Sequence, residues 1–149
     1  MLPELTTNQK GAAAEWAIIH LATRLGVEVY RPIFEGGRFD LILAPGTRLL
    51  RVQCKWAVRR GGIVTIRCYS SRRSRDGFLN RAYSAHDVDL IAAYCESLDT
   101  CYLLPPELFD GRTDLSLRIT PTANNQKRGI HWAADFEFAA KLGQLTEGP

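Results

Sequence analysis

The stretch from Gly37 to Trp56, GRFDLILAPGTRLLRVQCKW, constrains the fold more than any other part of this sequence. It begins with an apolar, strand-like run at Phe39–Leu43, continues through the turn-forming residues APGT, and ends with a second strand-like run at Leu49–Trp56. In the second run apolar residues alternate with polar ones, as expected for a strand that buries one face. The sequence therefore predicts a β-hairpin whose apolar face packs on a core.

The position of the turn decides which polar side chains share a face of this hairpin. A two-residue turn at Pro45-Gly46 places Asp40 opposite Arg51, whereas a turn one residue later places it opposite Gln53. A three-residue loop puts Asp40 on the other face. With either two-residue turn, a carboxylate, an amide and the ammonium group of Lys55 converge on one patch of a rigid sheet.

Length and composition indicate an ordinary globular domain. The 149 residues include 46% hydrophobic and 23% charged residues, so we expect one domain that spans residues 1–149. No apolar run approaches the roughly 18–20 residues that span a bilayer. The first ten residues lack the apolar core of a signal peptide, and we therefore expect a cytoplasmic protein. The four cysteines form no CxxC pair and are predicted to be buried free thiols.

The remaining segments alternate between helix-like and strand-like patterns. A helix is predicted at Gln9–Leu25, with Thr7 or Asn8 as its N-cap, and another at Ile130–Leu142. We expect Ser70–Asp76 to be a mobile surface loop. Further strands are predicted at Val27–Phe34, Gly62–Tyr69, Asp87–Tyr94, Thr100–Leu104 and Leu115–Ile119, with short helices at Phe78–Tyr83 and Glu107–Phe109. This order predicts an α/β (α+β) fold with a mixed β-sheet core flanked by helices.

Positive charge is concentrated in one part of the chain. The segment from Arg48 to Arg81 contains ten basic residues and one acid, Asp76, a net charge of +9, whereas the whole chain carries +3. An arginine-rich segment of this kind suits a phosphate backbone, although a solvated basic face is the alternative. The residues predicted to contact DNA are Arg59, Arg60, Arg67, Arg72, Arg73 and Arg75.

Asp40, followed on the next strand by Gln53-Cys54-Lys55 and preceded by a helix that carries Glu15, resembles the motif of the PD-(D/E)XK nuclease superfamily. Glutamine replaces the usual second acid, which gives a QxK variant. The wider pattern is similar to the small group I intron homing endonucleases of this superfamily. The matching stretches are KGAAAEWA, YRPIFEGGRFDLI, RVQCKWA, DVDLIAAYCESLDTCYLLP and the late NNQ.

The resemblance implies a restriction-endonuclease-like fold, cleavage of duplex DNA with Mg²⁺ as cofactor, and a homodimer or a dimer of dimers. It implies catalytic positions at Glu15, Asp40, Gln53 and Lys55. The implied metal ligands are Asp40, the backbone carbonyl of Cys54 and, directly or through water, Glu15.

Phosphodiester hydrolysis gives these residues distinct roles. A cation neutralises charge that develops on the phosphoryl oxygens, and Mg²⁺ prefers oxygen ligands. Asp40 is the natural anchor ligand, whereas Gln53 offers only a neutral amide oxygen, so the site lacks one negative charge unless Glu15 supplies it. Lys55 could orient the attacking water and stabilise the pentacovalent state as a point charge.

Each of these residues also has a purely structural interpretation. Asp40 could cap a strand end or pair with Arg38 or Arg51. Glu15 could face water at the edge of the apolar stripe of its helix. Glutamine and lysine are common on exposed strand faces, so the hypothesis depends on the ordered set and not on any single residue.

The sequence thus predicts a Mg²⁺-dependent, site-specific DNA endonuclease that acts as a homo-oligomer, since a chain this small needs a second copy to cut both strands. A structure-specific nuclease such as a Holliday junction resolvase is the alternative enzyme. A catalytically silent DNA-binding module is the alternative of another class. The target sequence, the cleavage pattern, the choice between dimer and tetramer and the location of the gene in an intron cannot be read from the sequence.

Overall fold

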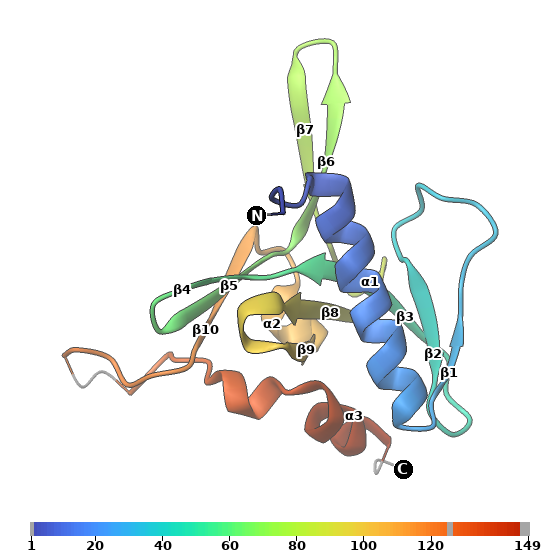
Figure 1. The fold of residues 1–149 in the computed structure, drawn as a ribbon. Helices are drawn as coiled ribbons and strands as arrows, with labels where there is room; N and C mark the ends of the chain where they lie inside the picture. Colours follow the sequence, from blue (N-terminus) through green and yellow to red (C-terminus); the bar gives the residue numbers. More distant parts are fainter. Residues whose placement is uncertain (1, 125–126, 147–149) are drawn as a thin grey trace.

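The computed structural model describes residues 2–124 and 127–146 of the chain. Two helices, α1 (Thr7–Arg24) and α3 (Phe138–Thr146), lie on a five-stranded mixed sheet (Figure 1). The sheet has the order β1-β2-β3-β8-β9, formed by Glu28–Tyr30, Leu41–Ala44, Leu50–Trp56, Leu90–Cys95 and Thr100–Leu104. The predicted α+β class with a mixed sheet and flanking helices is confirmed.

The predicted hairpin is formed by β2 and β3. Leu41 lies opposite Val52 in antiparallel register, which is the register expected for a turn at Gly46-Thr47. On its other side β3 pairs in parallel with β8, and this pairing runs the whole way from Val52 to Trp56. The β2 ladder stops at Leu41, opposite Val52, whereas β3 continues to Trp56. The last residues of β3 therefore extend past the end of β2, and the strand edge on that side is open.

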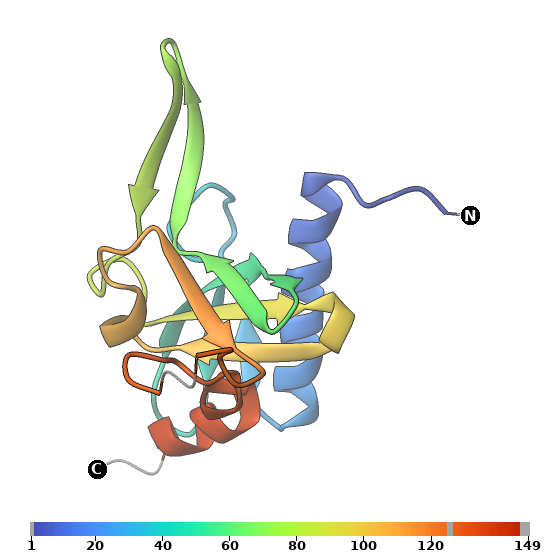
Figure 2. The same cartoon turned by 90° about the vertical axis from the view of Figure 1, so that its left-hand side faces the viewer.

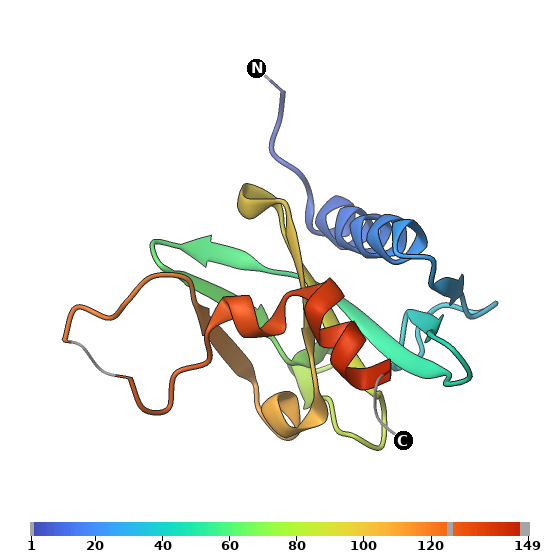
Figure 3. The ribbon, with the colours of Figure 1, turned by 90° about the horizontal axis from the view of Figure 1, so that it is seen from below.

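The two faces of the five-stranded sheet pack on different layers. One face, which includes Leu43, Val52 and Leu103, is covered by Ile18 of α1 and Phe138 of α3. The other face packs on a second sheet with the order β10-β5-β4, as well as on α2 (Pro106–Phe109). Figure 3 shows α1 and α3 on the same side of the central strands. The strands of the second sheet are Asp114–Arg118 (β10), Ile63–Arg67 (β5) and Val58–Arg60 (β4).

Helix α1 has well-defined ends. Thr6 is its N-cap, one residue earlier than expected, because its hydroxyl accepts from Gln9 N while the Gln9 side chain accepts from Thr6 N. The helix is followed by Gly26, whose φ of +79° suits glycine. Between these ends Ala14, Ile18 and Ala22 are buried at a spacing of four residues, and this stripe holds the helix on the sheet.

The segment from Tyr69 to Ala82 differs from the prediction. It forms a hairpin of β6 (Tyr69–Ser74) and β7 (Gly77–Ala82), where a loop and a short helix were expected. The hairpin projects away from the two sheets (Figures 1 and 2). Its tight turn uses Gly77 at a φ of +120°. Since β7 is exposed along most of its length, no alternation of buried and polar residues marks it as a strand.

Two other predictions are corrected. The strand expected at residues 62–69 is β5 (Ile63–Arg67), which is shorter at both ends and belongs to the second sheet, where it pairs with β10 and β4. The C-terminal helix starts at Phe138 and not at Ile130, because Ala133–Phe136 forms a 3-10 turn and Glu137 has an extended conformation. Asn125 and Gln126 of the NNQ stretch lie outside the described residues.

All four cysteines are buried free thiols, as predicted. Among the described residues, no helix is both long and apolar enough to cross a membrane.

The packing of α1 on the sheet predicts a large effect of one core substitution. Ile18→Ala should lower the free energy of unfolding by about 2–5 kcal/mol, because Ile18 is fully buried between the helix and the sheet. Ile33→Ala removes the same atoms from a side chain that is 92% exposed, and it should change stability by less than about 0.5 kcal/mol. Urea unfolding followed by circular dichroism measures both, and equal effects would contradict this packing.

Candidate active site

Asp40 is fixed to the edge of β3 at the point where β2 begins. Its backbone N–H donates to the carbonyl of Val52 at 2.9 Å, and its Oδ2 accepts from the backbone N–H of Cys54 at 2.9 Å. Burial raises the pKa of Asp40 above its usual value, although the Cys54 N–H and the nearby Lys55 ammonium oppose this shift. The carboxylate is therefore held in place by the strand that carries the QxK residues.

Of the structural alternatives for Asp40, pairing with Arg38 or Arg51 is not observed, because these arginines bind other acids, whereas the contact with the Cys54 N–H does cap the strand end. Arg51 pairs with Asp89, with 3.2 Å between Nε and Oδ2. Arg38 pairs with Asp87, with 3.2 Å between Nη2 and Oδ2. Asp40 is thus left facing Lys55 and the open edge of β3.

Lys55 lies on the face of β3 opposite α1. Its Nζ donates to the carbonyl of Tyr69 at 2.9 Å and lies 5.0 Å from the centroid of the Tyr83 ring. Burial lowers the pKa of Lys55, whereas the Asp40 carboxylate acts against this shift. The ammonium group is therefore positioned by a backbone oxygen and an aromatic ring.

Gln53 places an oxygen without a partner in the site. Its Nε2 donates to the carbonyl of Cys54 at 3.4 Å. Its Oε1 is buried and accepts no hydrogen bond from any residue that the structure describes. A buried amide oxygen in this condition is a candidate ligand for a cation or for a water bound to one.

Glu15 approaches the site from α1 on the other face of the sheet. Burial raises its pKa above the usual value, and the negative charge of Asp40 raises it further, while an ion pair with Arg31 lowers it. Glu15 is half-buried, so it does not simply face water. The structure therefore brings both Glu15 and Lys55 within electrostatic reach of Asp40 at the end of the hairpin.

Two residues near Lys55, Arg38 and Tyr83, were not predicted as part of the site, and Arg38 was considered only as a possible partner of Asp40. Arg38 donates to the carbonyl of Ala82 at 2.9 Å, and its guanidinium carbon lies 4.2 Å from the centroid of the Tyr83 ring. Burial raises the pKa of Tyr83 to about 12, so its hydroxyl stays protonated at neutral pH. These contacts join residues that are distant in the sequence, and the only signal was the position of Arg38 two residues before Asp40.

The residues present fit a hard divalent cation such as Mg²⁺. The carboxylates of Glu15 and Asp40 interact electrostatically, Asp40 contacts Cys54, and Gln53 and Cys54 contribute an unpartnered Oε1 and a backbone carbonyl, all of them oxygen ligands of the kind Mg²⁺ prefers. Within residues 2–124 and 127–146, no group of three or more acidic, histidine or cysteine side chains could hold a metal. A cation here would thus depend on neutral oxygens as well as on carboxylates.

The arginines predicted to contact DNA follow two consecutive hairpins. Arg59 and Arg60 are exposed on β4, and Arg67 is exposed at the end of β5. Arg72 and Arg73 lie in β6, and Arg75 is exposed in the turn between β6 and β7. These strands follow directly after β3, so the basic surface begins beside Lys55.

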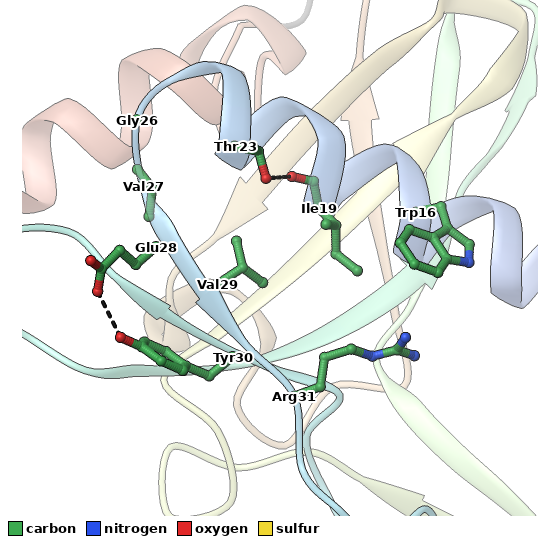
Figure 4. A pocket seen from close by; sticks show the side chains of 9 residues that line it. All are labelled: Trp16, Ile19, Thr23, Gly26, Val27, Glu28, Val29, Tyr30 and Arg31. Carbon is green, nitrogen blue, oxygen red and sulfur yellow. Dashed lines mark hydrogen bonds between the residues drawn. The ribbon is translucent and has the colours of Figure 1, made fainter.

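Two cavities flank the candidate site. One, of about 540 Å³, lies between α1 and β1, and its lining is partly apolar and also includes Thr23, Glu28, Tyr30 and Arg31 (Figure 4). The Arg31 guanidinium lies 5.4 Å from the centroid of the Trp16 ring. The other, of about 660 Å³, lies between the start of α1 and strands β3 to β5, and its walls include Cys54 and Lys55. The second cavity is the one that opens beside the QxK residues.

The buried carboxylate of Asp40 predicts a pH-dependent stability difference. Since its folded pKa is raised above the usual 3.8, wild-type stability falls as the pH rises from that value through the folded pKa. Asp40→Asn keeps an oxygen for the Cys54 N–H without this penalty. The variant should match the wild type at low pH and be more stable at pH 7, as measured by urea unfolding across this range. Equal or lower stability at pH 7 would contradict the burial penalty.

Comparison with known proteins agrees with this geometry. A sequence profile described as PD-(D/E)XK endonuclease matches residues 5–139. A solved structure of a bacterial homing endonuclease, I-Ssp6803I, has a TM-score of 0.76 and 23% sequence identity, covering 97% of this chain and 100% of that chain. This likeness confirms the expected fold, and a search of curated proteins gave no match. Because the family profile covers nearly the whole chain, the protein belongs to the PD-(D/E)XK endonuclease family.

Proposed function

We propose that this endonuclease cuts duplex DNA at specific sites with Mg²⁺ as its cofactor, in the manner of a homing enzyme. The observation that carries the proposal is the convergence of Asp40, Gln53 and Lys55 at the free end of the β2–β3 hairpin, with Glu15 brought in by α1. A carboxylate and an amide oxygen can hold a divalent cation, and an ammonium group can stabilise negative charge on the phosphoryl group.

Each residue of the candidate site has a separate role in this proposal. Mg²⁺, when bound, neutralises charge on the phosphoryl oxygens and lowers the pKa of a coordinated water. Asp40 holds its carboxylate at the strand edge through the Cys54 N–H, and Gln53 contributes the buried Oε1. Lys55 orients the attacking water and stabilises negative charge on the phosphoryl group, since its ammonium lies near Asp40.

In this proposal Glu15 supplies the second negative charge of the site, beside that of Asp40. In the structure it is paired with Arg31, so it must exchange that partner, or share it, when a cation is present. Burial raises the pKa of Glu15, and the negative charge of Asp40 raises it further, while Arg31 lowers it. Glu15 and Asp40 would help to hold a divalent cation, whose charge would offset the repulsion between the two carboxylates.

DNA is the partner that fits the basic surface. The two arginine-bearing hairpins β4–β5 and β6–β7 follow β3 along the chain, and their exposed arginines include Arg59, Arg60, Arg67, Arg73 and Arg75. Arginine binds phosphate oxygens through several donors at once. The β6–β7 hairpin extends beyond the body of the protein (Figure 2), and we infer that it reaches along the duplex from the cleavage site.

A homo-oligomer supplies the second active site that is needed to cut both strands. The surface best suited to a second copy surrounds the cavity between α1 and the edge strand β1. Trp16 is 61% exposed there, and Tyr30 is exposed beside it. Large apolar side chains clustered at a sheet edge are typical of association surfaces.

The nuclease proposal is tested by substitution of the two charged residues at the hairpin end. Asp40→Ala and Lys55→Ala should each reduce Mg²⁺-dependent cleavage at least about 100-fold, because each removes a charge next to the reacting phosphate. Binding, measured in Ca²⁺, should stay nearly constant. Cleavage is measured on a randomised duplex library and on four-way junctions, and Lys141→Ala is the control for loss of a lysine far from the site.

The outcomes separate the competing functions. Cleavage of one duplex sequence supports the site-specific enzyme, whereas cleavage of junctions regardless of sequence indicates a resolvase. Tight binding of the library without any cleavage indicates a silent DNA-binding module. Equal loss of binding and cleavage in Lys55→Ala would show that Lys55 is only a phosphate contact.

The proposed association surface is tested by placing a charged side chain on it. Trp16→Glu should shift the protein towards monomer, because a carboxylate would be buried against the second copy. Phe78→Glu alters a comparably exposed aromatic residue, 72% exposed, on the β6–β7 hairpin and should leave the assembly unchanged. Sedimentation velocity measures the molar mass of both variants. An unchanged assembly in Trp16→Glu would place the interface elsewhere.

A further inference from the structure

The cavity of about 660 Å³ beside Lys55 is rich in positive charge. Lys10, from α1, lines it together with Lys55, Arg60 and Arg67, whereas Asp114 is the single acid in its wall. Thus four cations face one carboxylate in a hollow large enough for part of a ligand. In the described part of the chain, neither Lys10 nor Arg60 takes part in a salt bridge.

The N-terminal end of α1 adds to this positive potential. Thr7, the first residue of this 18-residue helix, also lines the cavity, and the first turn contains no acidic residue. The aligned peptide dipoles of a helix give its N-terminus a partial positive charge that favours anions. Side chains and backbone therefore act in the same direction at this place.

Gly11 leaves the helix wall of the cavity open. Glycine is a poor helix former, and it is placed here well inside α1. A Cβ added at Gly11 would meet no atom within 4 Å, so no neighbouring group requires the glycine for packing. Because Gly11 lines the cavity, its bare backbone allows a ligand to approach the helix closely.

The cavity is continuous with the candidate active site. Cys54 and Lys55 belong to its wall, and the backbone N–H of Cys54 donates to Asp40. A DNA strand whose scissile phosphate lies at Asp40 and Lys55 would bring a neighbouring part of its backbone to this wall. The ligand that matches these constraints is a phosphodiester of the strand being cut.

We propose that this cavity is a binding pocket for a backbone phosphate next to the scissile one, contacted by Lys10, Arg60 and Arg67 and kept open by Gly11. The proposal rests on the proposed nuclease function and adds Lys10 and Gly11 to the residues that position DNA. Their role is to hold the strand in register with Asp40 and Lys55, and neither residue touches the reacting atoms.

The first experiment fills the pocket without weakening the helix. Gly11→Leu places a good helix former at an open position, so the melting temperature should stay the same or rise. The leucine side chain should enter the cavity and lower the affinity for a short duplex of random sequence, measured by fluorescence anisotropy without metal, at least about tenfold. Unchanged affinity in the folded variant would overturn the proposal.

The second experiment tests whether Lys10 contacts a DNA phosphate, through the salt dependence of the affinity for DNA. Wild-type affinity should fall steeply with salt, and Lys10→Ala should reduce the slope of log affinity against log salt by about 0.9. Arg24→Ala removes a cation from the last turn of the same helix and should leave the slope unchanged. Equal slopes for Lys10→Ala and the wild type would remove Lys10 from the DNA surface.

These measurements separate the pocket from the function on which it rests. If the wild type binds and cuts DNA while the Lys10 and Gly11 variants behave as the wild type does, the pocket is wrong and the nuclease assignment stands. If the wild type does not bind duplex DNA at low salt, both proposals fail together. Weaker binding in both variants with cleavage retained at saturating DNA supports the pocket as a positioning site.

Discussion

The hydrogen bond from the Cys54 backbone N–H to the Asp40 carboxylate is the interaction on which the site depends. It forms where β2 stops pairing with β3, so it replaces a ladder hydrogen bond with a side-chain contact. This replacement holds Asp40 rigidly and leaves the rest of β3, with Gln53 and Lys55, accessible from one edge. The same bond partly offsets the burial of the carboxylate, whose pKa is nevertheless raised.

The charges around this bond are arranged in separate local pairs. Glu15 is paired with Arg31 and Arg38 with Asp87, while Lys55 donates to the Tyr69 carbonyl. Each charge thus has a partner that is not Asp40, and Asp40 remains without an ion pair at hydrogen-bond distance among the described residues. A carboxylate held in this way is available to a cation, because binding the cation breaks no existing salt bridge of Asp40.

The parts of the structure that the sequence predicted are those with a buried face. The alternation from Leu50 to Trp56 predicted β3, and the register that pairs Leu41 with Val52 was among the expected ones. The β6–β7 hairpin was missed because it is mostly exposed, so its residues carry no periodic signal. At the site, Asp40 and Lys55 came from the strand pattern and Glu15 from the family motif. Arg38 and Tyr83 meet only through tertiary packing, which no local pattern encodes.

Glutamine at position 53 is consistent with this electrostatic arrangement. The pKa values of Glu15 and Asp40 are both raised, so their surroundings already disfavour negative charge. A carboxylate in place of the buried Gln53 amide would add a further negative charge one residue before Cys54, which contacts Asp40. The amide of Gln53 keeps an oxygen, the buried and unpartnered Oε1, without adding that charge. The QxK variant therefore keeps an oxygen at position 53 while it limits the electrostatic repulsion between buried groups in this part of the protein.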